Sequence, residues 1–416
     1  MDSEEVFVGI AIIVGLAAAC QLIAPKLKIP ALVLLLPAGF IAGNAFDAVD
    51  PTAIFGVAFT PLVQIAVGII LFHGGLELVE ERLVKQDRTI IFRLVLVGAL
   101  ITLAAATVTV ALFLGVNTQI SLLLGAIFVV SGPTVVGPLL AFARPNARVR
   151  RILAWEGTLI DPVGALIAVL VFQAVQASEE PSVGLAIQLF AKAIVIGVIG
   201  GLVGLALVWA GMKLAGPSRI LGTEVLLFSV VIATAGTNAV FDDSGLVAAV
   251  LMGMVAPLIV KGRVAEVKPF FDTIVNASIG VLFISISALV TPESLQGLML
   301  PCLGIVAVLV LVLRPLTALL LTIRSTLTLK ERIYVGWMAP RGIVAASTAA
   351  SFSGALVALG VPDSEVLLPV TFLVIVGTVV FYSATAVPMA GALGLREPDA
   401  GPDELVDMPE EVKPLA

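Results

Sequence analysis

The sequence predicts an all-α polytopic membrane protein, and three observations carry this prediction. Of the 416 residues, 60% are hydrophobic and only 12% are charged, whereas typical soluble domains contain about 25% charged residues. The mean hydropathy is +1.16. Apolar runs near the roughly 20 residues needed to cross a bilayer recur along almost the whole chain. This composition excludes soluble, collagen-like, disordered, disulfide-rich and nucleic-acid-binding classes.

Apolar runs bounded by charge, proline or glycine predict about thirteen transmembrane helices. They cover residues 6–24, 29–46, 54–76, 90–114, 119–143, 154–176, 183–212, 220–241, 244–260, 269–291, 297–323, 333–351 and 365–394. The first run follows MDSEEVF, which lacks the basic region of a cleavable signal peptide, so we expect it to remain as a span.

The distribution of basic residues predicts the orientation in a prokaryotic-type plasma membrane. Nineteen of the 23 Lys and Arg residues fall in every second loop, and the other four lie within spans. The positive-inside rule then places the C-terminus in the cytoplasm and, with thirteen spans, the N-terminus outside. Residues 395–416 are acidic and rich in proline, which is typical of a disordered cytoplasmic tail. Residues 1–394 are expected to form one transmembrane domain.

Several absences narrow the function. The sequence has no phosphate-binding GxxxxGKS/T motif and no loop long enough for a soluble domain, so an ion gradient rather than ATP is expected to drive transport, and no enzyme activity is expected. Two cysteines in apolar runs and a single histidine make a metal cluster or another cofactor unexpected.

Two spans contain helix breakers at mid-depth. In span 119–143, Pro133 and Pro138 each remove a backbone donor, and in span 333–351, Pro340 does the same. These two spans are seven apart, so six spans, a linker and six spans would make them symmetry mates. We therefore expect a first repeat (6–176), a linker helix (183–212) and a second repeat (220–394) of inverted topology, a layout typical of secondary transporters.

The span between these features carries a charged residue. Asp161 lies ten residues after the basic loop ending at Arg151, about 15 Å into the membrane along a helix. Thr158 shares the helix face of Asp161, and Pro162, a fourth expected helix breaker, frees the Thr158 carbonyl. The sequence therefore predicts a group of oxygens around one carboxylate near the midplane.

Arg341 lies at a similar depth and needs an anion, because an unpaired charge is costly inside the membrane. The candidates by depth are Glu156 and Asp161. Glu156 is about 140° around the helix from Asp161, so we expect it to face a different partner.

The segments SGPTVVGPLL, WEGTLIDPVGALIAVLVF and APRGIVAA, preceded by LFHGGLEL, resemble bacterial NhaP-type cation:proton antiporters of the sodium/hydrogen exchanger superfamily. The resemblance implies exchange of Na⁺, or of Li⁺ or K⁺, for protons, with a role in pH homeostasis. It also implies a thirteen-helix fold with crossed, broken helices, and a homodimer. Asp161 would carry either the cation or the proton, and Glu156 would pair with Arg341.

The expected mechanism is competition at Asp161, because a buried carboxylate binds either a proton or a desolvated cation. Thr158, Ser131 and Thr134 are expected to supply further oxygens to the ion. Many relatives have polar or acidic residues where this chain has Gly132, Ile160 and His73, so the preferred ion and the stoichiometry stay open.

Four residues are candidates for the ion path or for pH sensing. His73 is either a pH sensor or a hydrogen-bonded core residue, since imidazole titrates near neutral pH. Glu77 lies on the ion path or at a solvated helix end. Asp242 and Asp243 belong to an acidic outer face that would attract cations, although the positive-inside bias alone also predicts loops without basic residues there.

Two alternatives remain at this point. One is a carrier with an inverted repeat that moves an organic anion anchored by Arg341. The other is a cation channel, or a membrane sensor without transport. In every case the lipid bilayer is a partner.

Overall fold

The computed structural model describes residues 2–397, apart from 28, 47, 81–82, 177–182, 216–218 and 261–263. Within these residues the structure is almost entirely helical, and the only strand-like pairing is an isolated bridge between Pro145 and Arg396. Nine helices in this part of the chain are long and apolar enough to cross a membrane. The prediction of an all-α polytopic membrane protein is therefore confirmed, while most of the predicted tail lies outside the described residues.

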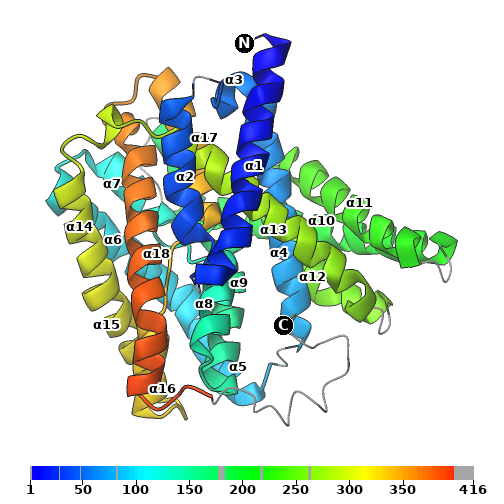
Figure 1. The fold of residues 1–416 in the computed structure, drawn as a ribbon. Helices are drawn as coiled ribbons and strands as arrows, with labels where there is room; N and C mark the ends of the chain where they lie inside the picture. Colours follow the sequence, from blue (N-terminus) through cyan, green and yellow to red (C-terminus); the bar gives the residue numbers. More distant parts are fainter. Residues whose placement is uncertain are drawn as a thin grey trace.

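The elements follow the order of the predicted spans (Figure 1). The first half contains α1 (Ser3–Leu27), α2 (Leu32–Ala45), α3 (Pro51–Phe55), η1 (Gly56–Ala58), α4 (Phe59–Glu80), α5 (Lys85–Phe92), η2 (Arg93–Val97), α6 (Gly98–Leu114), α7 (Thr118–Ile127), α8 (Pro133–Ala143) and α9 (Ala147–Gln176). The second half contains α10 (Val183–Ala215), α11 (Arg219–Asn238), α12 (Ser244–Val260), α13 (Val264–Ala288), η3 (Glu293–Leu295), α14 (Met299–Val308), η4 (Leu309–Leu313), α15 (Arg314–Leu321), α16 (Leu329–Trp337), α17 (Ile343–Ala358), η5 (Ser364–Val366) and α18 (Leu367–Ala392).

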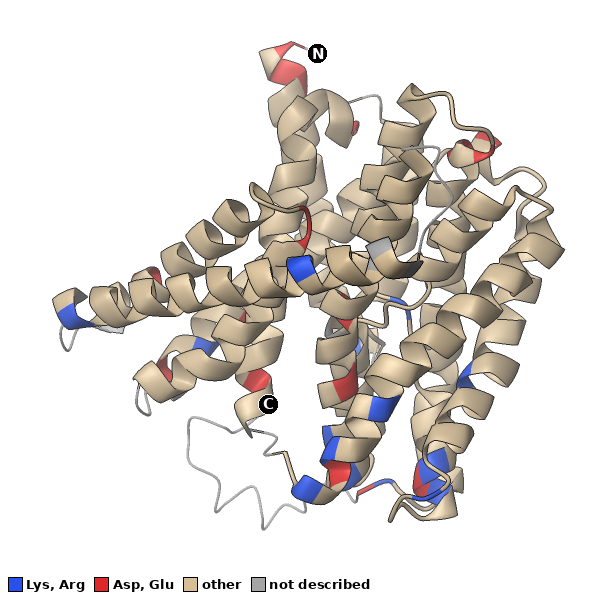
Figure 2. Cartoon of the chain, turned by 180° about the vertical axis from the view of Figure 1, so that it is seen from behind, with Lys and Arg blue, Asp and Glu red and all other residues tan. Residues whose placement is uncertain are grey.

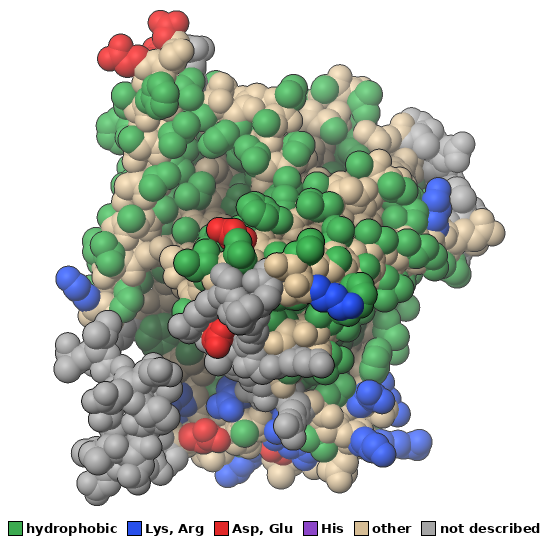
Figure 3. All heavy atoms as spheres, turned by 90° about the vertical axis from the view of Figure 1, so that its right-hand side faces the viewer, with side chains coloured by type: hydrophobic (Ala, Val, Ile, Leu, Met, Phe, Trp, Pro, Cys, Tyr) green, Lys and Arg blue, Asp and Glu red, His purple; other side chains and the backbone are tan. Residues whose placement is uncertain are grey.

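The surface is apolar in the way that a bilayer requires. Figure 3 shows hydrophobic side chains spread over much of one face of the molecule. Leu112, Leu214 and Leu258 are among the large aliphatic side chains that are mostly exposed. Soluble monomers rarely expose contiguous apolar patches of more than a few hundred Å². The exposed side chains therefore suit contact with lipid.

Two helical segments are broken near their middle. The first stops at Ile127 and resumes at Pro133, where the proline occupies the first turn of α8 and its missing N–H removes no helical hydrogen bond. The second stops at Trp337 and resumes at Ile343, with Pro340 in the gap. Both breaks expose backbone groups inside the protein, which membrane proteins tolerate where those groups line a cavity or meet other protein groups.

Two of the four predicted helix breakers do not break a helix. Pro138 lies inside α8, and Pro162 lies inside the thirty-residue α9. The prediction that they interrupt their helices is wrong, because each proline removes only one donor and the helix continues on both sides. Each proline still frees one carbonyl, that of Thr134 and that of Thr158 respectively.

The two breaks cross each other. A Cβ atom placed on Gly342 would lie 3.0 Å from the Cα atom of Gly132, and one placed on Gly132 would lie 3.4 Å from the Cα atom of Gly342. A side chain at Gly342 would therefore press on the backbone of Gly132, whereas a Cβ atom on Gly132 would make only an ordinary van der Waals contact with Gly342. Helix α9 packs against both broken segments, since it contacts α7, α8, α16 and α17. The crossing therefore lies beside the helix that carries the predicted ion-binding aspartate.

Candidate functional site

Asp161 on α9 is completely buried, and neither of its carboxylate oxygens has a hydrogen-bond partner among the described residues. A polar group from the first turn of α8 borders the same point as this carboxylate. The Asp161 Oδ2 atom and the Thr134 Oγ1 atom each lie 3.2 Å from the position that a Cβ atom on Gly132 would occupy. The absent side chain of Gly132 thus leaves a small space bordered by a carboxylate and a hydroxyl.

The predicted oxygen ligands divide into two groups. Thr134 and Asp161 border the space at Gly132, and the Thr134 hydroxyl makes no hydrogen bond within the described residues. Thr158, one turn before Asp161, donates its hydroxyl to the Ala154 carbonyl at 3.0 Å. Ser131 lines a small cavity together with Glu156, Arg314 and Arg341. The structure therefore brings Thr134 to Asp161 and places Ser131 with a different set of charges.

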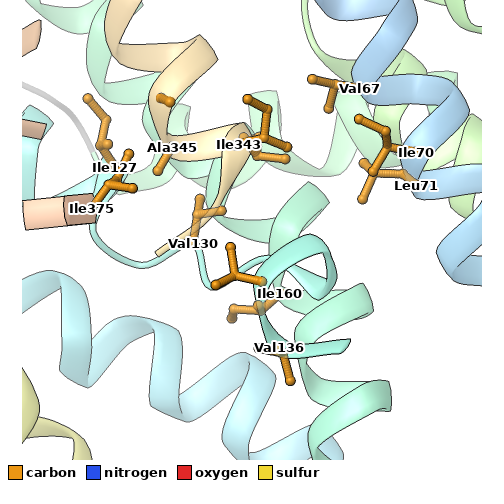
Figure 4. Packing of buried hydrophobic residues seen from close by; sticks show 14 of the residues in the cluster. Val67, Ile70, Leu71, Ile127, Val130, Val136, Ile160, Ile343, Ala345 and Ile375 are labelled. Carbon is orange, nitrogen blue, oxygen red and sulfur yellow. The ribbon is translucent and has the colours of Figure 1, made fainter. Parts of the chain in front are cut away.

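The elements next to Asp161 also carry buried apolar side chains. Figure 4 shows Val130 in the first break, Val136 on α8, Ile160 on α9 and Ile343 at the start of α17 close together. All four are buried. An isolated ionised carboxylate in such surroundings is strongly disfavoured unless a cation or a proton neutralises it.

Two cavities reach the threonines of the site. One, of about 300 Å³, is lined by Thr134 together with His73, Glu77 and Asp272. The other, of about 210 Å³, is lined by Thr158, with Glu77 again and other residues of α4, α8 and α9. The two cavities share lining residues, among them Glu77. Because they share these residues and reach Thr134 and Thr158, the two cavities favour an aqueous route to the site.

His73 is buried and has a specific partner. Its Nε2 atom lies 2.6 Å from the Oδ1 atom of Asp272 on α13, whose side chain is partly exposed. This contact agrees with the alternative of a hydrogen-bonded core histidine. No pattern in the sequence connects His73 with Asp272, so this pairing was not predicted.

Glu156 does not pair with Arg341, and that prediction is wrong. Arg314 at the start of α15 donates from Nη1 to Glu156 Oε1, and from Nη2 to Glu156 Oε2 at 2.8 Å. Arg341 instead donates from Nη1 to the carbonyls of Val129 and Val130, at 3.4 and 3.2 Å. These carbonyls follow the end of α7, where the helix dipole is negative, so Arg341 finds its negative partner in the backbone.

The acidic pair on the predicted outer face is only half buried. Asp243 is 7% exposed, whereas Asp242 is exposed. The Gln64 side chain donates to Asp243 Oδ1 at 3.2 Å. Burial and the neighbouring Asp242 charge raise the pKa of Asp243 to about 7, although the Gln64 hydrogen bond lowers it. Asp243 therefore titrates in the neutral range, outside the spanning helices.

Known proteins share this sequence pattern. The family model of the transmembrane sodium/hydrogen exchangers matches residues 9–391. The chain is 26% identical over 410 residues to the K(+)/H(+) antiporter NhaP of Alkalimonas amylolytica, covering 96% of this chain and 69% of that protein. It is 25% identical over 400 residues to the probable Na(+)/H(+) antiporter 2 of Methanocaldococcus jannaschii, covering 90% of this chain and 94% of that protein.

A solved structure has the same fold. The sodium proton antiporter MjNhaP1 of Methanocaldococcus jannaschii, determined at pH 8, aligns with a TM-score of 0.75 and 22% sequence identity. The alignment covers 94% of this chain and 99% of that chain. The overall fold is therefore common to both molecules.

Proposed function

The chain belongs to the transmembrane sodium/hydrogen exchanger family and is a multi-pass monovalent cation/proton antiporter of the cell membrane, and we propose that the cation and the proton compete for Asp161. The observation that carries this proposal is the completely buried carboxylate without a hydrogen-bond partner in the described residues. A charge in that position requires neutralisation, and either ion can provide it.

We propose that the cation occupies the space beside Gly132. There the Asp161 carboxylate and the Thr134 hydroxyl border one small volume, and hard cations such as Na⁺ favour oxygen ligands. The Thr158 carbonyl, freed by Pro162, supplies a further oxygen on the same helix. When the cation leaves, a proton takes its place on Asp161, so one ion is exchanged for the other.

The same proposal includes thirteen spans and inverted repeats over 6–176 and 220–394, joined by the linker 183–212. Broken segments occur at the fifth and twelfth positions. Two π-helical segments, η2 and η4, occur at the corresponding fourth and eleventh positions, and paired irregularities of this kind support a repeat. Alternating access would then arise from one group of helices rocking against the other around a fixed site.

The orientation and assembly are also proposals. Figure 2 shows Lys and Arg gathered at the end of the molecule that contains α5 and α16, and acidic residues near the N-terminus. This supports a cytoplasmic position for the α5 end and an outer position for the N-terminus. A homodimer follows from the family resemblance, and light scattering of the purified protein tests it.

We propose Na⁺ as the preferred ion, with Li⁺ and K⁺ as further substrates. The organic-anion alternative loses support because Arg341 already donates to two backbone carbonyls. A channel loses support because a binding site that holds one ion at a time favours coupled exchange over free passage.

Proteoliposomes containing a trapped pH dye test the proposal. Adding Na⁺, K⁺ or Li⁺ outside wild-type liposomes should drive proton movement, and Asp161→Asn should abolish it for every ion. Glu293→Gln, which changes an exposed carboxyl in η3, is the matched control and should behave like wild type. Undiminished exchange by Asp161→Asn would show that another group carries the ions.

A further inference from the structure

Three potential metal ligands meet in the cavity that leads to Thr134. His73 and Glu77 lie four residues apart on α4 and so face the same side of the helix. Asp272 approaches them from α13. One ligand atom of each residue lies within 4.8 Å of the other two. All three residues line the cavity of about 300 Å³.

We propose that His73, Glu77 and Asp272 form a binding site for a divalent transition-metal ion of the Zn²⁺ type. One imidazole nitrogen and two carboxylate oxygens are donors that Zn²⁺ accepts, with water in the fourth position. The transported alkali cation is a different case, because imidazole suits transition metals whereas hard cations favour oxygen. The site is therefore separate in its chemistry from the space at Gly132.

The geometry needs only a modest adjustment. The His73 and Asp272 ligand atoms are 2.6 Å apart, as in a hydrogen bond. In a tetrahedral zinc site with bonds near 2.0–2.2 Å, two ligand atoms lie about 3.3 Å apart. The pair must therefore separate by less than about 1 Å, and the partly exposed Asp272 side chain has room to move.

The remaining ligand comes from Glu77. This carboxylate also lines the adjoining cavity, together with Arg150. To bind a metal ion, the Glu77 carboxylate must therefore turn away from its present neighbours in the adjoining cavity. Asn276 also lines the cavity of about 300 Å³, and its side-chain amide could add a neutral oxygen ligand.

The position of the site gives it a function. Thr134 lines the same cavity and borders the carboxylate of Asp161. A metal ion bound between α4 and α13 would fill the approach to these residues. We infer that such a metal inhibits exchange, and this second part rests on the proposed function.

Metal binding is measured directly on the purified full chain in detergent, with any polyhistidine tag removed. Zn²⁺ is titrated in competition with a chromophoric chelator. We expect one ion per chain, and an affinity reduced about tenfold or more in His73→Ala and in Asp272→Asn. Loss of a residue that merely hydrogen-bonds a metal ligand already lowers metal affinity by about tenfold or more, and loss of the ligand itself should cost at least as much. Glu293→Gln is the control carboxyl and should bind like wild type.

A substitution that exchanges one ligand for another separates a metal ligand from a structural residue. His73→Cys should retain Zn²⁺ binding through its thiolate, whereas His73→Gln should lose it. Absence of stoichiometric binding to wild type, or equal binding by His73→Ala and Asp272→Asn, would overturn the proposal. If the His73 variants do not fold, Asp272→Asn alone decides it.

Inhibition is tested in proteoliposomes, with each variant compared with its own rate before zinc. Zn²⁺ on the cavity side should slow wild-type exchange, a chelator should restore it, and Asp272→Asn should be less sensitive. Binding without inhibition would overturn the second part alone. No wild-type exchange in the absence of zinc would instead count against the proposed function and leave the binding result unaffected.

Discussion

Arg314 donates two hydrogen bonds to the Glu156 carboxylate, and this pair joins α15 to α9 inside the protein. The Glu156 side chain is 5% exposed and the Arg314 side chain 12%. A second bond from Arg314 Nη2 reaches the Val335 carbonyl on α16 at 3.0 Å. One guanidinium thus connects three helices, including the one that carries Asp161.

We predict that removing either member of this pair destabilises the protein strongly. Breaking a buried ion pair from one side costs about 3–5 kcal/mol, because the remaining charge is left uncompensated. Glu156→Gln and Arg314→Gln should each lower the unfolding temperature in detergent, and the double variant should recover part of the loss. The double variant of Glu156→Gln with Arg341→Gln is the comparison. If it recovers stability as much as Glu156→Gln with Arg314→Gln does, the observed pairing is contradicted.

We predict that Gly132→Ala impairs cation binding while leaving the fold intact. Gly132 has φ −76° and ψ 145°, which alanine adopts without strain. Its new methyl group would lie 3.2 Å from Asp161 Oδ2 and from Thr134 Oγ1, in the proposed cation space. The apparent KM for the cation should rise about tenfold or more, the usual effect of one methyl group in a confined site.

The matched control for this variant is Gly354→Ala on α17, where an added Cβ meets no atom within 4 Å. It should transport like wild type. The KM should rise more for K⁺ than for Li⁺ in Gly132→Ala, since the larger ion needs more of the lost space. An unchanged KM for all three ions would place the cation elsewhere.

We predict a pH-dependent stability that depends on Asp243. Burial raises the pKa of Asp243 to about 7, and the Asp242 charge adds to the rise, so the folded protein favours the protonated carboxyl more than the unfolded chain does. This stabilisation is complete at low pH and is lost as the pH rises through about 7. Asp243→Asn should therefore be more stable than wild type at about pH 8, and similar to it at low pH.

Asparagine suits this test because Asp243 has φ 56°, and asparagine tolerates the left-handed region. The measurement is the unfolding temperature of both proteins across the pH range. Parallel pH curves for wild type and Asp243→Asn would contradict the titration of this group. Asp242→Asn provides the second comparison, and it should weaken the pH dependence without removing it.

The sequence indicated the positions of the breaks because their causes are local. Pro133 and Pro340 lie at the two interruptions, and the nearby Gly132 and Gly342 meet where the two segments cross. The same local rule failed at Pro138 and Pro162, because it does not tell whether a freed carbonyl has somewhere to go. Each helix continues past its proline, and Thr134 and Thr158, which carry the freed carbonyls, each line a cavity.

The side-chain pairs depended on packing that the sequence does not contain. Depth alone allowed Glu156 to meet any buried arginine, and Arg341 was only one of the four basic residues within the predicted spans. The direction of Glu156, away from Asp161, was predictable from the helix period, but its neighbour α15 was not. In the same way, no local signal linked His73 to Asp272, which are 199 residues apart.

The contact of Arg341 with the end of α7 has a consequence for biogenesis. The carbonyls of Val129 and Val130 precede their guanidinium partner by 212 and 211 residues. During synthesis, the first half of the chain enters the bilayer long before Arg341 leaves the ribosome. The interrupted helix formed by α7 and α8 must therefore remain without its guanidinium partner during this time, with its carbonyls hydrogen-bonded to water or to the insertion machinery. The native crossing closes only when most of the second half has been inserted.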